Sequence, residues 1–163
     1  MTNPAPAPTR SVWLVVCGAL CAAPILYGVL APMVAPDVQP APTLALMRTA
    51  FAGAATLGFL LATYLMRRVA RAADPGQGLF ALRPEGELAT PAAFQLRSIF
   101  AMALFESVAI FGFVLVFLGA PPEQAWVWSA ASFAGMVGIA LPAGLAYWRE
   151  LERAGQGGAA PIG

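Results

Sequence analysis

The sequence predicts an all-α membrane protein, a bundle of four transmembrane helices whose two termini both lie in the cytoplasm. Of its 163 residues, 60% are hydrophobic and 10% are charged, whereas soluble domains carry about 25% charged residues. Four long apolar runs divide the chain, each close to the length of about 20 residues that a helix needs to cross a bilayer. All the basic residues are arginines, and they gather next to one end of these runs. We therefore treat residues 1–163 as a single membrane domain.

The first predicted span covers residues 12–34 and follows a short tail rich in Pro and Ala. This run is too long for the apolar core of a secretory signal peptide, and no clean small-residue cleavage site follows it. Pro24 and Pro32 predict a kink and an irregular outer end, which membranes tolerate where neighbouring helices cover the freed backbone groups. We therefore expect this segment to be retained as a helix.

The second predicted span covers residues 44–66, and a cluster of three arginines follows it directly. Arginine clusters mark the cytoplasmic side of a membrane helix. With both termini and the loop 67–97 in the cytoplasm, eight of the nine arginines lie on that side. The predicted topology anchors are Arg67, Arg68, Arg71 and Arg149.

Arg48 is the exception, one turn inside the outer end of the second span. Its long side chain can reach the outer headgroups while its stem stays in the membrane. The alternative is a buried partner for Glu106. Counted from the inner anchors at about 1.5 Å per residue, the two side chains differ in depth by roughly a dozen Å, which is too far for direct pairing.

The third and fourth predicted spans cover residues 98–118 and 125–148. Because the connector between them is short, we expect them to be antiparallel neighbours. The fourth span begins with two tryptophans and ends with Tyr147 and Trp148. Aromatic residues at both ends of a span are typical of the two membrane interfaces, so we expect an aromatic belt at these positions.

Glu106 lies near the middle of the third span. An ionised carboxylate at that depth costs on the order of 3 kcal/mol or more, so such a residue is a functional candidate by default and is expected in its neutral form. Thr56 of the second span lies at the same depth when both are counted from the inner arginines. The sequence therefore predicts Glu106 and Thr56 as the candidate ion-binding residues, with the Thr hydroxyl or a backbone carbonyl accepting from the acid.

Small residues recur on two of the spans at the spacing that lets membrane helices approach closely. We expect the third span to pack on the small-residue face of the second. The row on the fourth span could dock the third span or a different subunit, and packing within a single bundle is the simpler interpretation. The residues predicted for helix packing are Ala50, Gly53, Ala54, Gly58, Gly135 and Gly138.

The stretch QLRSIFAMALFESVAIFGFVLVFLG, residues 95–119, resembles the carboxylate-bearing helix of the proteolipid, or c, subunits of rotary ATP synthases. In that family an Arg-containing cytoplasmic loop leads into an Ala-rich helix with an acid at mid-membrane. The resemblance implies that Glu106 is an ion-binding carboxylate and that residues 109–112 match the tail that follows it. It is confined to this stretch, since the second span holds only Gly53 and Gly58 of the long alternating Gly pattern of the family's partner helix.

Composition limits the function classes. The chain has no His and no Lys, and it carries neither a nucleophile elbow nor a phosphate-binding loop, so we expect no enzyme, no metal site and no cofactor. Nothing in it is basic enough for nucleic acid. We expect an accessory or assembly subunit of a larger membrane complex, in contact with the lipid bilayer and with other membrane subunits or a second copy of itself. The alternative is a proteolipid-like or carrier protein that handles H⁺ or Na⁺ through Glu106.

The predicted location is the inner membrane of a bacterium, as a multi-pass protein. This expectation rests on composition, because abundant Ala, Gly, Pro and Arg with no Lys is typical of a GC-rich genome.

Overall fold

The structure is a computed structural model, which describes residues 9–35, 42–69 and 88–157. Four helices in these ranges are long and apolar enough to cross a membrane, which confirms the predicted all-α fold class. Arg71 and most of the predicted loop 67–97 lie outside the described residues. The elements are α1 (Arg10–Val34), α2 (Leu44–Arg68), α3 (Pro91–Phe117), α4 (Glu123–Gly135), the π-helical turn η1 (Met136–Ala140) and α5 (Leu141–Gly157).

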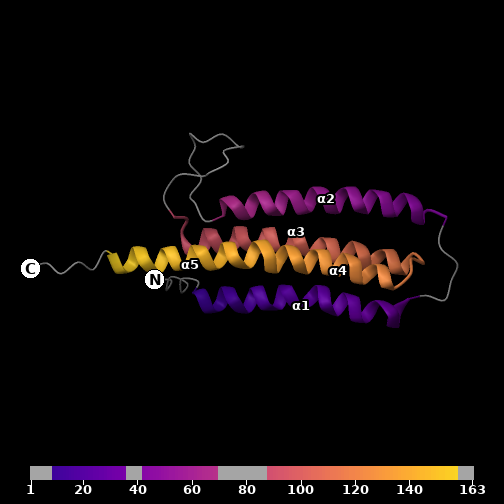
Figure 1. Cartoon of the computed structure of the whole chain (residues 1–163), viewed down its shortest axis with the longest axis horizontal. Helices are drawn as coiled ribbons and strands as arrows, with labels where there is room; N and C mark the ends of the chain where they lie inside the picture. The colour runs from indigo at the N-terminus through magenta and orange to yellow at the C-terminus, as the bar shows by residue number, and fades with distance from the viewer. Residues whose placement is uncertain (1–8, 36–41, 70–87, 158–163) are drawn as a thin grey trace, which may run out of the picture.

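Helix α3 lies at the centre of the bundle. Figure 1 shows α2 along one side of α3 and α1 along the other, with α4 beside α3 and antiparallel to it. In the apolar window of α3, 44% of the residues are buried, against 11% in that of α2. Helix α2 is therefore peripheral, and most of its surface faces away from the bundle.

Helix α3 begins at Pro91 rather than near residue 98. The Thr90 hydroxyl accepts a hydrogen bond of 3.4 Å from the Ala93 N–H, and Pro91 occupies the first turn, where a missing N–H leaves no helical hydrogen bond unmade. Hydropathy placed the start too late because the first two turns carry polar side chains such as Arg97. The helix begins directly after its capping residue, Thr90, and the apolar run begins later.

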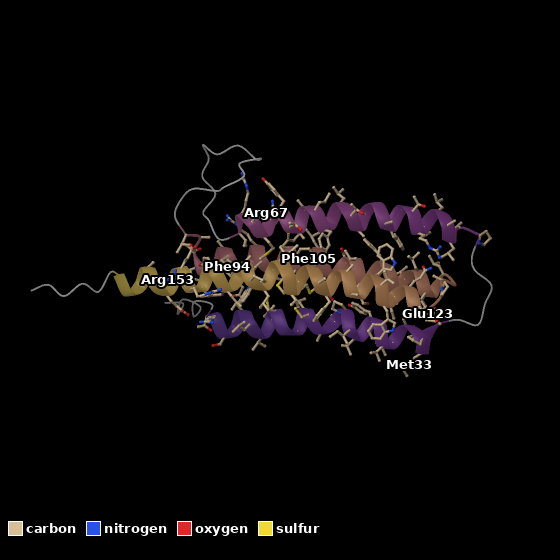
Figure 2. The ribbon with its side chains drawn as sticks, viewed as in Figure 1. Met33, Arg67, Phe94, Phe105, Glu123 and Arg153 are labelled. Carbon is tan, nitrogen blue, oxygen red and sulfur yellow. The ribbon has the colours of Figure 1, made fainter. Side chains whose placement is uncertain are left out.

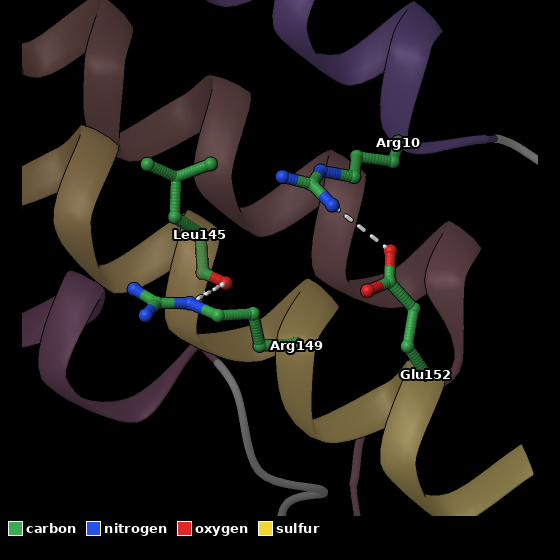
Figure 3. Close-up of polar contacts among 4 residues, drawn as sticks. All are labelled: Arg10, Leu145, Arg149 and Glu152. Atoms are coloured by element: carbon green, nitrogen blue, oxygen red, sulfur yellow. Dashed lines mark hydrogen bonds and ion pairs between the residues drawn. The ribbon is translucent and has the colours of Figure 1, made fainter. Parts of the chain in front are cut away.

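The last helix continues through η1 into α5 and extends past residue 148, the predicted end, to Gly157. Pro142 cannot donate to the turn before it, and the backbone responds with a wider turn in which the Leu141 N–H donates to the Met136 carbonyl. At the far end, Arg10 of α1 forms an ion pair of 3.0 Å with Glu152 (Figure 3). This contact lies beyond the predicted end of the span.

The turn between α3 and α4 closes with a left-handed glycine. Gly119 has a φ of 88°, and the Ala120 N–H donates to the Leu115 carbonyl over 3.0 Å. The Gly119 N–H donates to the Val116 carbonyl, also over 3.0 Å. These two bonds form a Schellman motif, which satisfies the last carbonyls of α3 and turns the chain directly into α4.

A cluster of buried aromatic rings joins three helices near the start of α3. Phe94 stacks on Tyr147 with ring centroids 3.7 Å apart, and Trp13 lies 5.8 Å from Phe94. The expected interfacial belt is wrong for Tyr147 and Trp148, because both are buried inside the bundle. The Tyr147 hydroxyl donates to the Ala89 carbonyl over 2.6 Å, whereas the buried Trp148 indole N–H has no hydrogen-bond partner among the described residues.

The two ends of the bundle differ in charge. Figure 2 shows Arg67 and Arg153 at one end, and Met33 and Glu123 at the other. We call the first the arginine-rich end. Arg48, near the start of α2, lies toward the opposite end.

Candidate functional site

A row of polar and sulfur contacts follows the line where α1 packs on α3, and we call this line the α1–α3 seam. The Trp13 indole N–H donates to the Ser98 hydroxyl over 3.0 Å. One turn further, the Cys17 thiol lies 3.3 Å from the Met102 sulfur. In both pairs the α3 residue is 85 positions after the α1 residue, so the two helices run parallel.

Glu106 belongs to this seam. The Tyr27 hydroxyl donates to Glu106 Oε1 over 3.1 Å, and both side chains are half-buried. The Tyr27 ring is held by Phe113, at 5.6 Å between centroids. No hydrogen bond to Glu106 Oε2 is present in the part of the chain that the structure describes. Glu106 therefore accepts a hydrogen bond from α1 through Oε1, and its Oε2 atom is left to accept another.

Sequence reasoning missed Tyr27. It lies 79 positions before Glu106, whereas the other two pairs are 85 positions apart. Its Cα is therefore farther from the arginine-rich end than Glu106 is. Side chains of a helix lean toward its N-terminus, which brings the long tyrosine side chain down toward Glu106. The signal in the sequence was a single phenolic hydroxyl inside an otherwise apolar span.

The structure does not bring Thr56 to Glu106. The Thr56 hydroxyl donates to the Ala52 carbonyl of its own helix over 2.8 Å. Thr56 faces Val108, across a groove between α2 and α4, whereas Glu106 is two residues earlier on α3 and faces α1. Successive residues of a helix are rotated by about 100°, so these two positions are on opposite faces of α3.

The residues expected at helix contacts divide into two groups. A Cβ on Gly135 would lie 2.5 Å from the Phe105 ring, and one on Gly58 would lie 3.8 Å from the Leu104 carbonyl, so both glycines face α3. A Cβ on Gly53 or Gly138 would meet nothing within 4 Å. Ala50 and Ala54 are likewise exposed. Helix α3 therefore packs on α2 through Ala55, Gly58 and Ala62 rather than through the whole small-residue set.

The described anchor arginines all lie at the arginine-rich end. Arg67 is exposed, and the Arg68 guanidinium carbon lies 5.3 Å from the centre of the Tyr64 ring. Arg149 donates through Nε to the Leu145 carbonyl over 3.2 Å (Figure 3).

Two further polar groups are buried on α4. Ser129 and Ser132 are at most 3% exposed, and neither hydroxyl has a hydrogen-bond partner among the described residues. Within those residues no group of three or more His, Cys, Asp or Glu side chains could hold a metal ion.

A comparison of the chain with protein-family models, with curated proteins and with solved structures found no match.

Proposed function

We propose that the protein is an accessory or assembly subunit of a larger complex in a bacterial inner membrane, without catalytic activity of its own. Both termini face the cytoplasm in this proposal, because the positive-inside rule assigns the arginine-rich end to that side. Glu106 then acts inside the bundle, as the group that ties α1 to α3.

The hydrogen bond from Tyr27 to Glu106 supports this proposal most directly. A carboxyl at membrane depth is costly, and a partner on the next helix reduces that cost. Interhelical hydrogen bonds of this kind hold membrane helices together where the hydrophobic effect between them is absent. In this proposal, Glu106 therefore serves to hold α3 against α1.

The outward face of α2 is the proposed contact with a neighbouring subunit. Gly53 there has open space around it, and Ala50 and Ala54 next to it are exposed. Small side chains allow the backbone of a second helix to approach closely. The exposed face of the central α3 carries large side chains instead, among them Leu96, Phe100 and Phe117.

The test is the size of the complex that native membranes release in mild detergent, measured on a native gel. Gly53→Leu places a large side chain on the proposed contact, at a position where a Cβ meets nothing within 4 Å. We expect the wild type to migrate in a species larger than the single chain and Gly53→Leu to migrate alone. Gly18→Leu on α1 is the matched control, because Gly18 is equally open. A wild type that runs as a single chain even after crosslinking in the membrane contradicts the proposal.

Ion handling is the second candidate, and the available Oε2 atom of Glu106 is what favours it. In this candidate Glu106 binds and releases H⁺ or Na⁺, as the resemblance to proteolipid subunits implies. Its test is H⁺ or Na⁺ flux across vesicles that contain the purified protein. Flux that Glu106→Gln abolishes supports ion handling, and wild-type vesicles as tight as empty ones count against it.

A further inference from the structure

A groove of about 350 Å³ separates α2 from α4, with Val108 of α3 as its floor. We call it the α2–α4 groove. Alanines on both walls leave the space open, although both helices pack on α3. Phe59 closes the groove toward the arginine-rich end, since a Cβ on Gly135 of α4 would lie 2.9 Å from its ring. The walls include Ala52, Thr56 and Phe59 of α2, and Trp128 and Ala131 of α4.

The lining of the α2–α4 groove is predominantly apolar. Thr56 carries the hydroxyl on its α2 wall, and that hydroxyl already donates to the Ala52 carbonyl. A ligand that needs hydrogen bonds therefore gains little from this groove. At membrane depth a hydrocarbon chain fits such a lining, since it makes no demand for polar partners.

Arg48 supplies the polar end of the site. It is four residues before Ala52 and seven before Ala55, so it lies on the same face of α2 as the groove, one turn further toward the outer end. Its side chain is exposed, and none of the described hydrogen bonds or ion pairs uses its guanidinium. A guanidinium binds phosphate through two parallel N–H groups.

We propose that Arg48 and the α2–α4 groove together bind one anionic phospholipid. Its phosphate lies on the Arg48 guanidinium, and one of its acyl chains lies in the groove between Arg48 and Phe59. The dimensions agree: Arg48 to Leu60 spans about 18 Å at 1.5 Å per residue, which lies between roughly 15 Å for half of the hydrocarbon core and roughly 20–22 Å for that half together with its headgroup region. The site therefore matches a single leaflet, the one at the Arg48 end. It does not depend on the proposed partner subunit, which contacts the outward face of α2 at Gly53.

The experiment is native mass spectrometry of the detergent-purified protein, titrated with phosphatidylglycerol or with phosphatidylcholine of the same acyl chains. We expect one phosphatidylglycerol to be retained per chain and phosphatidylcholine to be retained less. Arg48→Gln is expected to weaken phosphatidylglycerol binding about tenfold, because a charge-assisted hydrogen bond is lost. Ala131→Leu, which fills the groove, is expected to prevent retention.

Two controls separate the site from general effects. Arg67→Gln removes a charge at the other end, and Ala22→Leu adds the same volume at an exposed position of α1. Both variants are expected to bind phosphatidylglycerol like the wild type. Unfolding temperatures of all four variants check that each is folded. Equal binding of both phospholipids overturns the proposal, and so does wild-type binding by either Arg48→Gln or Ala131→Leu. A disulfide or bifunctional crosslink from Ala131→Cys to another protein chain in the native membrane also overturns it, since a helix then occupies the groove.

Discussion

The Trp13 indole fills the space next to Gly144, so closely that a side chain at position 144 would overlap its ring. This contact joins the first helix to the last one at the arginine-rich end. Gly144→Ala is expected to lower the free energy of unfolding by about 1–3 kcal/mol, the usual cost of overpacking a filled core. Thermal unfolding of the purified protein in detergent measures the change.

Gly18→Ala is the control for that variant, because a Cβ on Gly18 meets nothing within 4 Å. It is expected to stabilise α1 by about 0.5–1 kcal/mol, since Ala restricts the unfolded chain more than Gly does. If the two variants unfold at the same temperature, the packing of Trp13 on Gly144 is incorrect.

Tyr147→Phe removes the hydroxyl that donates to the buried Ala89 carbonyl. The expected loss in the free energy of unfolding is about 1–3 kcal/mol, because the carbonyl is left without a partner away from water. Tyr64→Phe is the matched control, since the Tyr64 hydroxyl has no hydrogen bond among the described residues. Equal stability of the two variants in chemical unfolding would argue against the Ala89 contact.

Gly119→Ala places a side chain on a residue with a φ of 88°. The left-handed conformation costs an ordinary residue about 1–2 kcal/mol, so the variant is expected to be less stable by that amount. Gly119→Asn is expected to lose less, because Asn adopts this conformation more readily than Ala. The order of unfolding temperatures, wild type above Asn above Ala, checks the turn; an Ala variant as stable as the wild type contradicts it.

A double-mutant cycle measures the bond between Tyr27 and Glu106. Tyr27→Phe and Glu106→Leu are expected to show a coupling free energy of about 0.6 kcal/mol and at most about 1.7 kcal/mol, the range found for membrane hydrogen bonds. A second cycle with Glu106→Gln in place of Glu106→Leu is the control. A Gln carbonyl still accepts a hydrogen bond from Tyr27, so the coupling free energy measured in this cycle is expected to be close to zero. Additive effects of Tyr27→Phe and Glu106→Leu would show that the two side chains do not interact.

Hydropathy predicted the four helices because it measures what a bilayer requires, a long run without uncompensated polar groups. It was less informative at helix ends, where capping at Thr90 and the continuation past Trp148 depend on side-chain and tertiary contacts. It also could not foresee the π-helical turn before Pro142, which is a local response of the backbone to a missing donor.

The partner of Glu106 could not be predicted for a different reason. Counting residues from the inner arginines gives the depth of a side chain but not the direction in which it points around the helix. Thr56 was chosen by depth alone, and it faces a groove on the opposite side of α3. The same count does not identify Tyr27, because its Cα is not level with Glu106 and only its long side chain reaches the acid.

The most direct test of the structural role of Glu106 is the rate at which a lipid-soluble carbodiimide modifies it in native membranes, with and without Na⁺. Such reagents attack protonated carboxyl groups that they can reach from the lipid. If Glu106 ties α1 to α3 through Tyr27, labelling is slow and independent of Na⁺, and it becomes faster in Tyr27→Phe. Rapid labelling of the wild type that Na⁺ suppresses would contradict this role and identify Glu106 as an exchangeable ion site.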